Sequence, residues 1–364
     1  MDRSSSERNC RKGEITLLDI AALAEVSRAT VSLVMRESPA VAVATRDRVL
    51  EAAKSLGYVY NRAASSLRTS QSGSVGILVT TVGNPFFAEI IEGVESVLSN
   101  SDRLVILGQH SESLDMQDRL LNRLLEYRVD GVILTAASGT STETINRLTN
   151  MGVAVVLCTR RIDGTNASYV GSDNEAGAQQ AVGHLVRDHD IRSLAFVGGL
   201  ASGSPHIERS RGMKKALRRT TLAKDAIYTL PTAPTREDAY HATTALLRSS
   251  PPLPLGIFAY NDVVAFGVAA SVRDAGLVVG CDVLLVGFDD VQASHFEQPP
   301  LTTVAIGAAA LGARAAETLV DLIISKGQPI EVVCENSLVV RGSCGCASTS
   351  NRFARSERSD VVTA

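Results

Sequence analysis

The chain has 364 residues, of which 45% are hydrophobic and 21% charged, and its formal net charge is −3. This length allows two or three domains, and the composition excludes an intrinsically disordered chain and a uniformly basic nucleic-acid binder. The charge is unevenly distributed, because residues 1–72 hold 11 Lys and Arg against 8 Asp and Glu, whereas the rest holds 25 against 31. A basic front end on an acidic body fits a chain whose N-terminal part contacts phosphate.

The sequence lacks the marks of export and of a metal site. No apolar run reaches the roughly 18–20 residues of a membrane span, and no secretory signal is present. Scattered cysteines are typical of a reduced, cytoplasmic protein. Cys344 and Cys346 are too close for the usual zinc-ligand spacing and have no second pair nearby. We therefore expect a cytoplasmic protein with no membrane contact, no cofactor and no metal. The cysteines are Cys10, Cys158, Cys281, Cys334, Cys344 and Cys346.

Residues 15–60 are predicted to form three short helices with apolar residues at helical spacing. About three residues link the first two helices, which forces a steep crossing and predicts a helix-turn-helix. Gly57 is expected to end the third helix. The predicted N-terminal caps are Thr16, with Asp19 completing a capping box, then Ser27 and Thr45.

The segments around this headpiece are polar. Residues 61–69 predict one more helix, which is marginal in water by itself at about nine residues. Residues 70–74 then break the pattern, so residues 61–73 are predicted to be a hinge helix and linker. Residues 1–14 and 347–364 are charged and Ser-rich without periodicity, and we expect disordered tails there.

From Val75 onward, short apolar strands alternate with amphipathic helices. Such strands are typical of a parallel sheet covered by helices on both faces. Seven strands over about 270 residues favour two sheets rather than one. In these folds, ligands bind at the carboxyl ends of the strands. The predicted strands are residues 75–79, 104–107, 131–134, 153–157, 194–197, 255–259 and 283–286.

Two sets of motifs, taken together in order and spacing, resemble the LacI/GalR family of bacterial repressors. The first set is ITLLDIA (15–21), VSRATVS (26–32), LGY (56–58) and NRAA (61–64) with Leu67. The second set is NPFF (84–87), DGVI (130–133), ND (261–262), GFDD (287–290) and PLTTV (300–304). The resemblance covers residues 15 to about 345, which is nearly the whole predicted ordered chain.

The resemblance implies an α/β core of two Rossmann-like lobes, similar to type I periplasmic binding proteins, after an all-α helix-turn-helix headpiece. The core spans residues 74–346. It implies an N-lobe of about residues 74–171 and 302–332, and a C-lobe of about 172–301 and 333–346. It also implies a homodimer on palindromic double-stranded operator DNA, and the tail lacks the leucine heptad that makes some relatives tetramers.

The resemblance assigns the DNA contacts. Arg28, Ala29 and Leu33 occupy positions that the family uses to touch base edges, and Arg28 can grip guanine through two hydrogen bonds. Thr30 and Ser32 are expected to contact phosphate. Leu33 replaces a common arginine, so it offers only apolar contact.

The hinge residues Asn61 and Leu67 complete the expected DNA-binding set. Asn61 can cap the hinge helix. In the family reading, Leu67 from each subunit wedges a base step in the minor groove and kinks the DNA. The alternative is that Leu67 packs on the core domain.

A small-molecule effector is expected between the lobes. Most of its predicted ligands follow apolar strands or begin helices, and Phe86 can stack on a ring. Several alternatives stay open: Arg161 can exchange roles with Arg160, Asp173 can be only a helix cap, and Phe86 can belong to the core. We expect Asp262 to be a cap and Phe87 a core residue. The expected effector-binding residues are Phe86, Arg160, Asp173, Arg209, Asn261 and Asp289.

The sequence therefore predicts a DNA-binding transcriptional regulator, a repressor, controlled by a sugar or related polar metabolite. Pro234 stands where many relatives place an aromatic, Thr159 replaces a frequent acid, and no tryptophan is present. The effector is then small and polar, or an acid bound by Arg160 and Arg209. A nucleobase corepressor is the alternative, and a solute-binding protein is a weaker one. No catalytic motif occurs in context, so we expect no enzyme.

Overall fold

The computed structural model describes residues 15–36, 38–59, 72–101, 103–218, 220 and 222–346. Contacts divide the chain into two units, residues 1–72 and 73–364, and each is described by itself. Within the described ranges, no helix is both long and apolar enough to cross a membrane.

The first unit is a three-helix headpiece of α1 (Leu17–Leu23), α2 (Arg28–Val34) and α3 (Val43–Leu56). The predicted capping box of Thr16 and Asp19 is confirmed, as is the Ser27 cap, whose hydroxyl accepts from Thr30 N. Gly57 ends α3 in the left-handed conformation, also as predicted. The helices bury a small core that includes Ile20, Val31 and Val49. The helix caps and this small hydrophobic core therefore both stabilise the headpiece.

The predicted cap at Thr45 is wrong. α3 begins three residues earlier, with Ala42 at the N-cap and no side-chain cap bond. Arg46 reaches back to donate to the Ser38 carbonyl at 2.6 Å. This bond ties the incoming loop to the first turn, so tertiary contact sets the start of the helix in place of a local cap.

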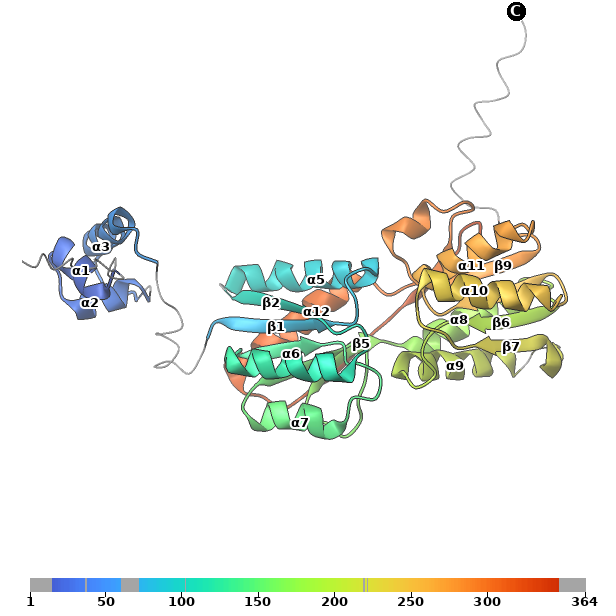
Figure 1. Cartoon of the computed structure of the whole chain (residues 1–364), viewed down its shortest axis with the longest axis horizontal. Helices are drawn as coiled ribbons and strands as arrows, with labels where there is room; N and C mark the ends of the chain where they lie inside the picture. Colours follow the sequence, from blue (N-terminus) through green and yellow to red (C-terminus); the bar gives the residue numbers. More distant parts are fainter. Residues whose placement is uncertain are drawn as a thin grey trace, which may run out of the picture. The chain divides into compact units, whose positions relative to one another are not determined.

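The second unit begins with a six-stranded, entirely parallel sheet in the order β11-β5-β4-β3-β1-β2. Helices α5 and α12 cover one face of this N-lobe, and α6 and α7 cover the other (Figure 1). The strands are β1 (Ser74–Val79), β2 (Leu104–Gln109), β3 (Gly131–Leu134), β4 (Ala154–Cys158), β5 (Ser168–Ser172) and β11 (Glu331–Cys334). The helices are α5 (Pro85–Leu98), α6 (Leu114–Glu126), α7 (Thr142–Asn150) and α12 (Ala308–Ser325).

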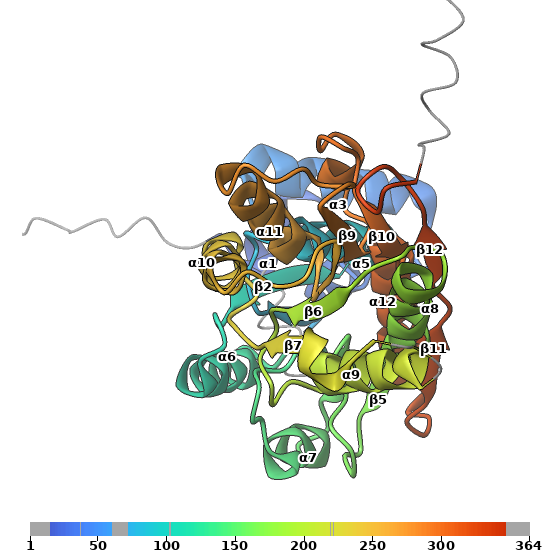
Figure 2. The ribbon, with the colours of Figure 1, turned by 90° about the vertical axis from the view of Figure 1, so that its right-hand side faces the viewer.

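The C-lobe contains a second six-stranded sheet in the order β12-β10-β9-β8-β6-β7, in which only β12 is antiparallel. Helices α8 and α9 pair, as do α10 and α11 (Figure 2). The strands are β6 (Ser193–Val197), β7 (Ile227–Leu230), β8 (Leu255–Ala259), β9 (Val283–Asp289), β10 (Thr302–Ala305) and β12 (Ser337–Val339). The helices are α8 (Asn174–Arg187), α9 (Ser204–Leu217), α10 (Arg236–Arg248) and α11 (Asp262–Asp274).

The predicted fold class is confirmed: two α/β lobes follow an all-α headpiece. The chain passes between the lobes three times, from β5 to α8, from β10 to α12 and from β11 to β12. Two lobe boundaries need correction. Strand β10 pairs with β9 of the C-lobe, so the N-lobe resumes after Ala305 rather than at residue 302. Strand β11 pairs with β5, so the N-lobe extends to Cys334.

Helices α5 and α12 pack in backbone contact. A Cβ atom at Gly312 would collide with the carbonyl of Ile90, and one at Gly93 would collide with the carbonyl of Ala309. Neither obstacle is a flexible side chain, so only glycine allows this spacing. The covering layer of the N-lobe therefore depends on two glycines inside helices, where glycine is otherwise unfavourable.

We predict that Gly312→Ala lowers the melting temperature of the full chain. Helix propensity alone would add about 1 kcal/mol of stability, but overpacking against Ile90 costs about 1–3 kcal/mol. The matched control is Gly183→Ala in α8, where an added Cβ meets only the movable end of Arg187. Thermal unfolding at fixed protein concentration checks this, and a higher melting temperature for Gly312→Ala would contradict the packing.

Candidate functional site

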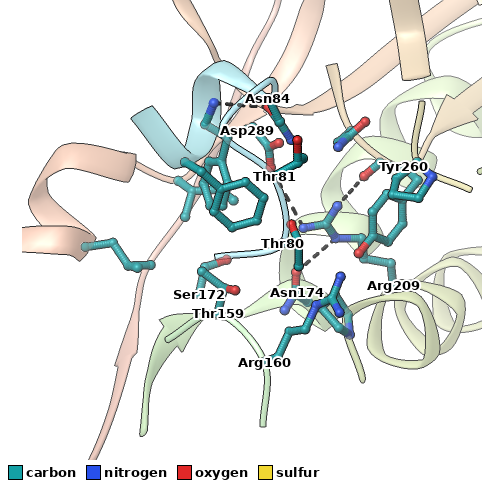
Figure 3. Close-up of a pocket in the computed structure, with 17 residues that line it drawn as sticks. Thr80, Thr81, Asn84, Thr159, Arg160, Ser172, Asn174, Arg209, Tyr260 and Asp289 are labelled. Carbon is teal, nitrogen blue, oxygen red and sulfur yellow. Dashed lines mark hydrogen bonds and ion pairs between the residues drawn. The ribbon is translucent and has the colours of Figure 1, made fainter. Parts of the chain in front are cut away.

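A cleft lies where the carboxyl ends of strands from both lobes meet (Figure 3). Its cavity has a volume of about 60 Å³, small for a ligand site because its polar side chains reach across to one another. The cleft is lined by Thr80, Thr81, Asn84, Phe86, Phe87, Thr159, Arg160, Ser172, Asn174, Pro205, Arg209, Pro234, Tyr260, Asn261, Asp289, Ile306 and Leu311.

Arg209 is a buried cation on the C-lobe side of the cleft. Its Nε donates to Asn174 Oδ1 at 2.9 Å, and its Nη1 donates to the carbonyl of Tyr260 (Figure 3). Its guanidinium carbon lies 3.6 Å from the ring centroid of Phe288 and 4.7 Å from that of Tyr260. These contacts fix the guanidinium plane at the cavity wall, which suits bidentate recognition of a polar ligand.

Asp289, the last residue of β9, is also buried and faces Arg209 across 4.0 Å. Burial raises the pKa of Asp289 well above its ordinary value, although Arg209 opposes that shift. Its backbone has a φ of 117°, a left-handed conformation that is rare for a side-chain-bearing residue. A buried carboxyl with one distant partner is suited to accept hydrogen bonds from a ligand's hydroxyl groups.

Arg160 enters the cleft from the N-lobe, just after β4, and its guanidinium is bound by Glu112. The two Glu112 oxygens accept from Arg160 at 2.6 and 3.0 Å, and the Ala136 carbonyl accepts at 2.9 Å. Burial alone would raise the pKa of Glu112. Hydrogen bonds from Arg160 outweigh burial and hold this pKa below its usual range. Glu112 was not among the site residues predicted from the sequence. Arg161 instead pairs with Glu331 at the surface, so the two arginines do not exchange roles.

Asp173 does not line the cleft, and of the two alternatives that the sequence left open for it, the structure favours the helix cap. Its Oδ1 accepts from Ala176 N at 2.9 Å, so it caps α8. The next residue, Asn174, faces the cavity and holds Arg209. One residue along the first turn of a helix changes direction by about 100°, which separates the capping side chain from the cavity-facing one.

Asn261 and Asp262 are adjacent at the start of α11 but have different roles. Asn261 lines the cleft and caps the helix, because its Oδ1 accepts from Val264 N at 2.9 Å. Asp262 is therefore not the cap that we expected. It lies inside the lobe, where its carboxyl accepts from the Ser294 and Thr303 hydroxyls at 2.7 and 2.6 Å. Burial raises the pKa of Asp262 to about 7 despite these bonds.

The aromatic part of the cleft comes from both lobes. Phe86 lines the cavity at the start of α5, as predicted, and Asn84 caps that helix. Phe87 is buried in the hydrophobic core, as predicted, and it also lines the cavity. Tyr260, which directly precedes Asn261, adds a ring that the sequence analysis did not single out. Pro234 and Thr159 also line the cavity, and they contribute neither an aromatic ring nor a charge there.

The five described DNA-site candidates lie on α2 of the headpiece. Arg28 and Ala29 are exposed at its first turn, while Thr30, Ser32 and Leu33 are half-buried. The Thr30 hydroxyl is 2.9 Å from that of Ser27. The remaining candidates, Asn61 and Leu67, lie outside the described residues, and their roles stay predictions.

Comparison with known proteins gives matches along nearly the whole chain. Residues 16–61 match the model for bacterial regulatory proteins of the lacI family, and residues 182–344 match a periplasmic binding protein-like domain. The HTH-type transcriptional repressor PurR of Histophilus somni (strain 129Pt) is 30% identical over 329 residues, covering 90% of this chain and 98% of its own.

Solved structures agree with this relationship. A lac repressor dimer bound to operator and the anti-inducer ONPF has a TM-score of 0.79 at 25% identity, covering 91% of this chain and 99% of its own. A complex of the transcriptional regulator CelR with cellobiose has a TM-score of 0.67 at 30% identity, covering 90% and 99%. With a helical headpiece and a two-lobed core that both match, this chain belongs to the lacI family of bacterial regulatory proteins.

Proposed function

We propose that this protein is a sequence-specific transcriptional repressor whose DNA affinity is set by a small polar effector bound between the core lobes. The observation that carries this proposal is the buried pair of Arg209 and Asp289 facing an interlobe cavity. Buried charges of this kind are costly unless they are paired and hydrogen-bonded. A ligand that supplies hydroxyl groups would satisfy both groups, and it would do so only where the two lobes meet.

DNA recognition is assigned to the exposed start of α2. Arg28 is the first residue of α2, and its guanidinium group can donate two hydrogen bonds to guanine. Ala29 and Leu33 offer apolar contacts. Thr30 and Ser32 are proposed to contact phosphate. The role of the hinge residues 61–69 in bending DNA remains part of the proposal on the strength of the family resemblance alone.

A sugar or sugar-like metabolite is the proposed effector class. Three groups support it: an arginine, a carboxyl and an amide, contributed by Arg209, Asp289 and Asn174, can bind neighbouring hydroxyls in bidentate fashion. The related CelR structure was solved with cellobiose. A nucleobase corepressor is the second candidate, favoured by the similarity to PurR along the full chain. Phe86 and Tyr260 would then stack on the base.

A homodimer acting in the cytoplasm completes the proposal. The related lac repressor structure is a dimer on operator. Exposed apolar side chains also support self-association, among them Leu104 and Leu107 on the edge strand β2. We infer that the cleft binds its ligand without catalysis, because the relatives are transcriptional regulators and the polar groups of the cleft are arranged for recognition.

In vitro selection from random duplexes with the full chain is expected to yield two inverted half-sites, since a two-fold dimer presents two copies of α2. Arg28→Ala should then cost about 1–3 kcal/mol at one base pair of each half-site and relax the preference there. Lys54→Ala on α3 is the control, because it removes the same charge from another exposed position. If Arg28→Ala weakened binding equally on all DNA sequences, Arg28 would contact phosphate and not a base.

For the effector, thermal-shift screening of sugars, sugar acids and nucleobases with the full chain should identify a stabilising compound. Asp289→Asn keeps the side-chain shape but removes charged hydrogen bonds worth about 1.5–3 kcal/mol, so affinity should fall roughly 10- to 150-fold. Asn174→Ala should also weaken binding, because Arg209 loses its Nε partner.

The matched control is Asp173→Asn, which lies beside Asn174 but outside the cavity and retains a capping side chain. It should bind the compound as tightly as the wild type. Operator affinity without the compound should be unchanged in all three variants. If Asp289→Asn bound the compound with wild-type affinity, the cleft would not be the effector site.

A further inference from the structure

Four metal-binding side chains converge on the C-lobe, outside the interlobe cleft. His184 lies in the last turn of α8, His189 follows that helix, and Cys344 and Cys346 follow β12. The four ligand atoms all lie within 4.8 Å of one another. The two histidines and the two cysteines are about 160 positions apart in the sequence, so only the fold brings them together.

Four of the six separations among these atoms fit the ligands of one tetrahedral ion. His184 Nε2 is 3.3 Å from His189 Nε2, 3.3 Å from Cys344 Sγ and 3.8 Å from Cys346 Sγ, and His189 Nε2 is 3.6 Å from Cys346 Sγ. Zinc bonds of about 2.0–2.1 Å to nitrogen and 2.3 Å to sulfur place tetrahedral ligands about 3.3–3.8 Å apart. These four separations fall in this interval, and all six separations are at most 4.8 Å.

Neighbouring groups orient the ligands. His184 Nδ1 is 2.8 Å from Asp188 Oδ2, which leaves Nε2 directed at the cluster. A carboxylate that holds the second ring nitrogen of a ligating histidine is a common feature of zinc sites. The Thr302 hydroxyl donates to Cys344 Sγ at 3.1 Å, and such a donor stabilises a thiolate. His184 is 8% exposed and Cys344 is fully buried, whereas His189 and Cys346 are half-buried, so one side of the cluster is shielded from water.

We propose that His184, His189, Cys344 and Cys346 bind one Zn²⁺ in a closed, structural site. Two thiolates and two imidazoles form the Cys₂His₂ set that selects zinc among the common divalent ions. Four protein ligands complete the tetrahedron, so no position stays open for a reacting water. This site replaces our expectation of no metal, which rested on the close spacing of the cysteines and on the lack of a second ligand pair nearby in the sequence.

The site would fasten the last described segment of the chain to the C-lobe. Strand β12 has only three residues, and the segment after it is held by Ser343, whose hydroxyl donates to the Leu285 carbonyl at 2.6 Å. A metal bridge from Cys344 and Cys346 to the end of α8 would add a further anchor. Asn174 in the effector cleft lies ten residues before His184, about 15 Å away along the helix axis, so the site is separate from the cleft.

Metal content of the full chain, purified without a histidine tag under reducing conditions and reconstituted with zinc, tests the proposal. After dialysis, we expect one zinc per chain by mass spectrometry. The variant Cys344→Ser/Cys346→Ser should lose this zinc. His189→Ala should lose it too, and it is the substitution least damaging to the fold because the His189 ring is only half-buried. Cys281→Ser is the matched control, because it removes an exposed free cysteine outside the cluster and should retain one zinc.

Two further measurements identify the ligands. Cobalt(II) in place of zinc should give the visible bands of a tetrahedral ion and a thiolate charge-transfer band that Cys344→Ser/Cys346→Ser abolishes. A chelator should lower the melting temperature of the wild type and of Cys281→Ser, but not of the double variant. Zinc retained in folded variants would show an adventitious ion elsewhere. A wild type without zinc, without the cobalt bands and without a chelator effect would also overturn the proposal.

Discussion

The buried guanidinium of Arg209 organises the C-lobe side of the cleft. A cation removed from water is destabilising by several kcal/mol unless hydrogen bonds and charges surround it. Here the partners come from the start of α8, the end of β8 and the end of β9, through Asn174, the Tyr260 carbonyl and Asp289. These elements must therefore reach one point in register. The parallel sheet meets this requirement, because neighbouring parallel strands end at the same edge.

Regular structure was predictable where the sequence repeats a simple physical pattern. The seven continuous apolar runs all form strands. Six of them are almost wholly buried, which demands such composition, whereas β2 is a partly exposed edge strand. Five strands were not predicted. β5 (Ser168–Ser172) and β10 (Thr302–Ala305) are buried, yet they contain serine, threonine and glycine. β7, β11 and β12 are short and only partly buried. Their pairing depends on neighbours that a local pattern does not contain.

The candidate site was partly predictable for a related reason. Arg160, Asn261 and Asp289 line the cleft because residues at the carboxyl ends of strands gather at one edge, and Arg209 reaches it from the second turn of α9. Asp173 and Asn174 are adjacent, and only helix geometry shows which one faces the cavity. Glu112 follows β2 in a left-handed loop conformation, and its pairing with Arg160 joins residues 48 positions apart. Contacts of that kind become visible only once the fold is known.

The three crossings between lobes also constrain how the protein is made. The N-lobe sheet is bounded by β11, and its covering helix α12 ends at Ser325, so neither exists until residues 308–334 have been synthesised. At roughly 5–20 residues per second, translation of residues 73–334 takes roughly 13–52 s. During that interval the apolar strands of the N-lobe are synthesised before their closing elements. The headpiece forms its own contact unit and can fold early, whereas the core must be protected from aggregation until its final segments emerge.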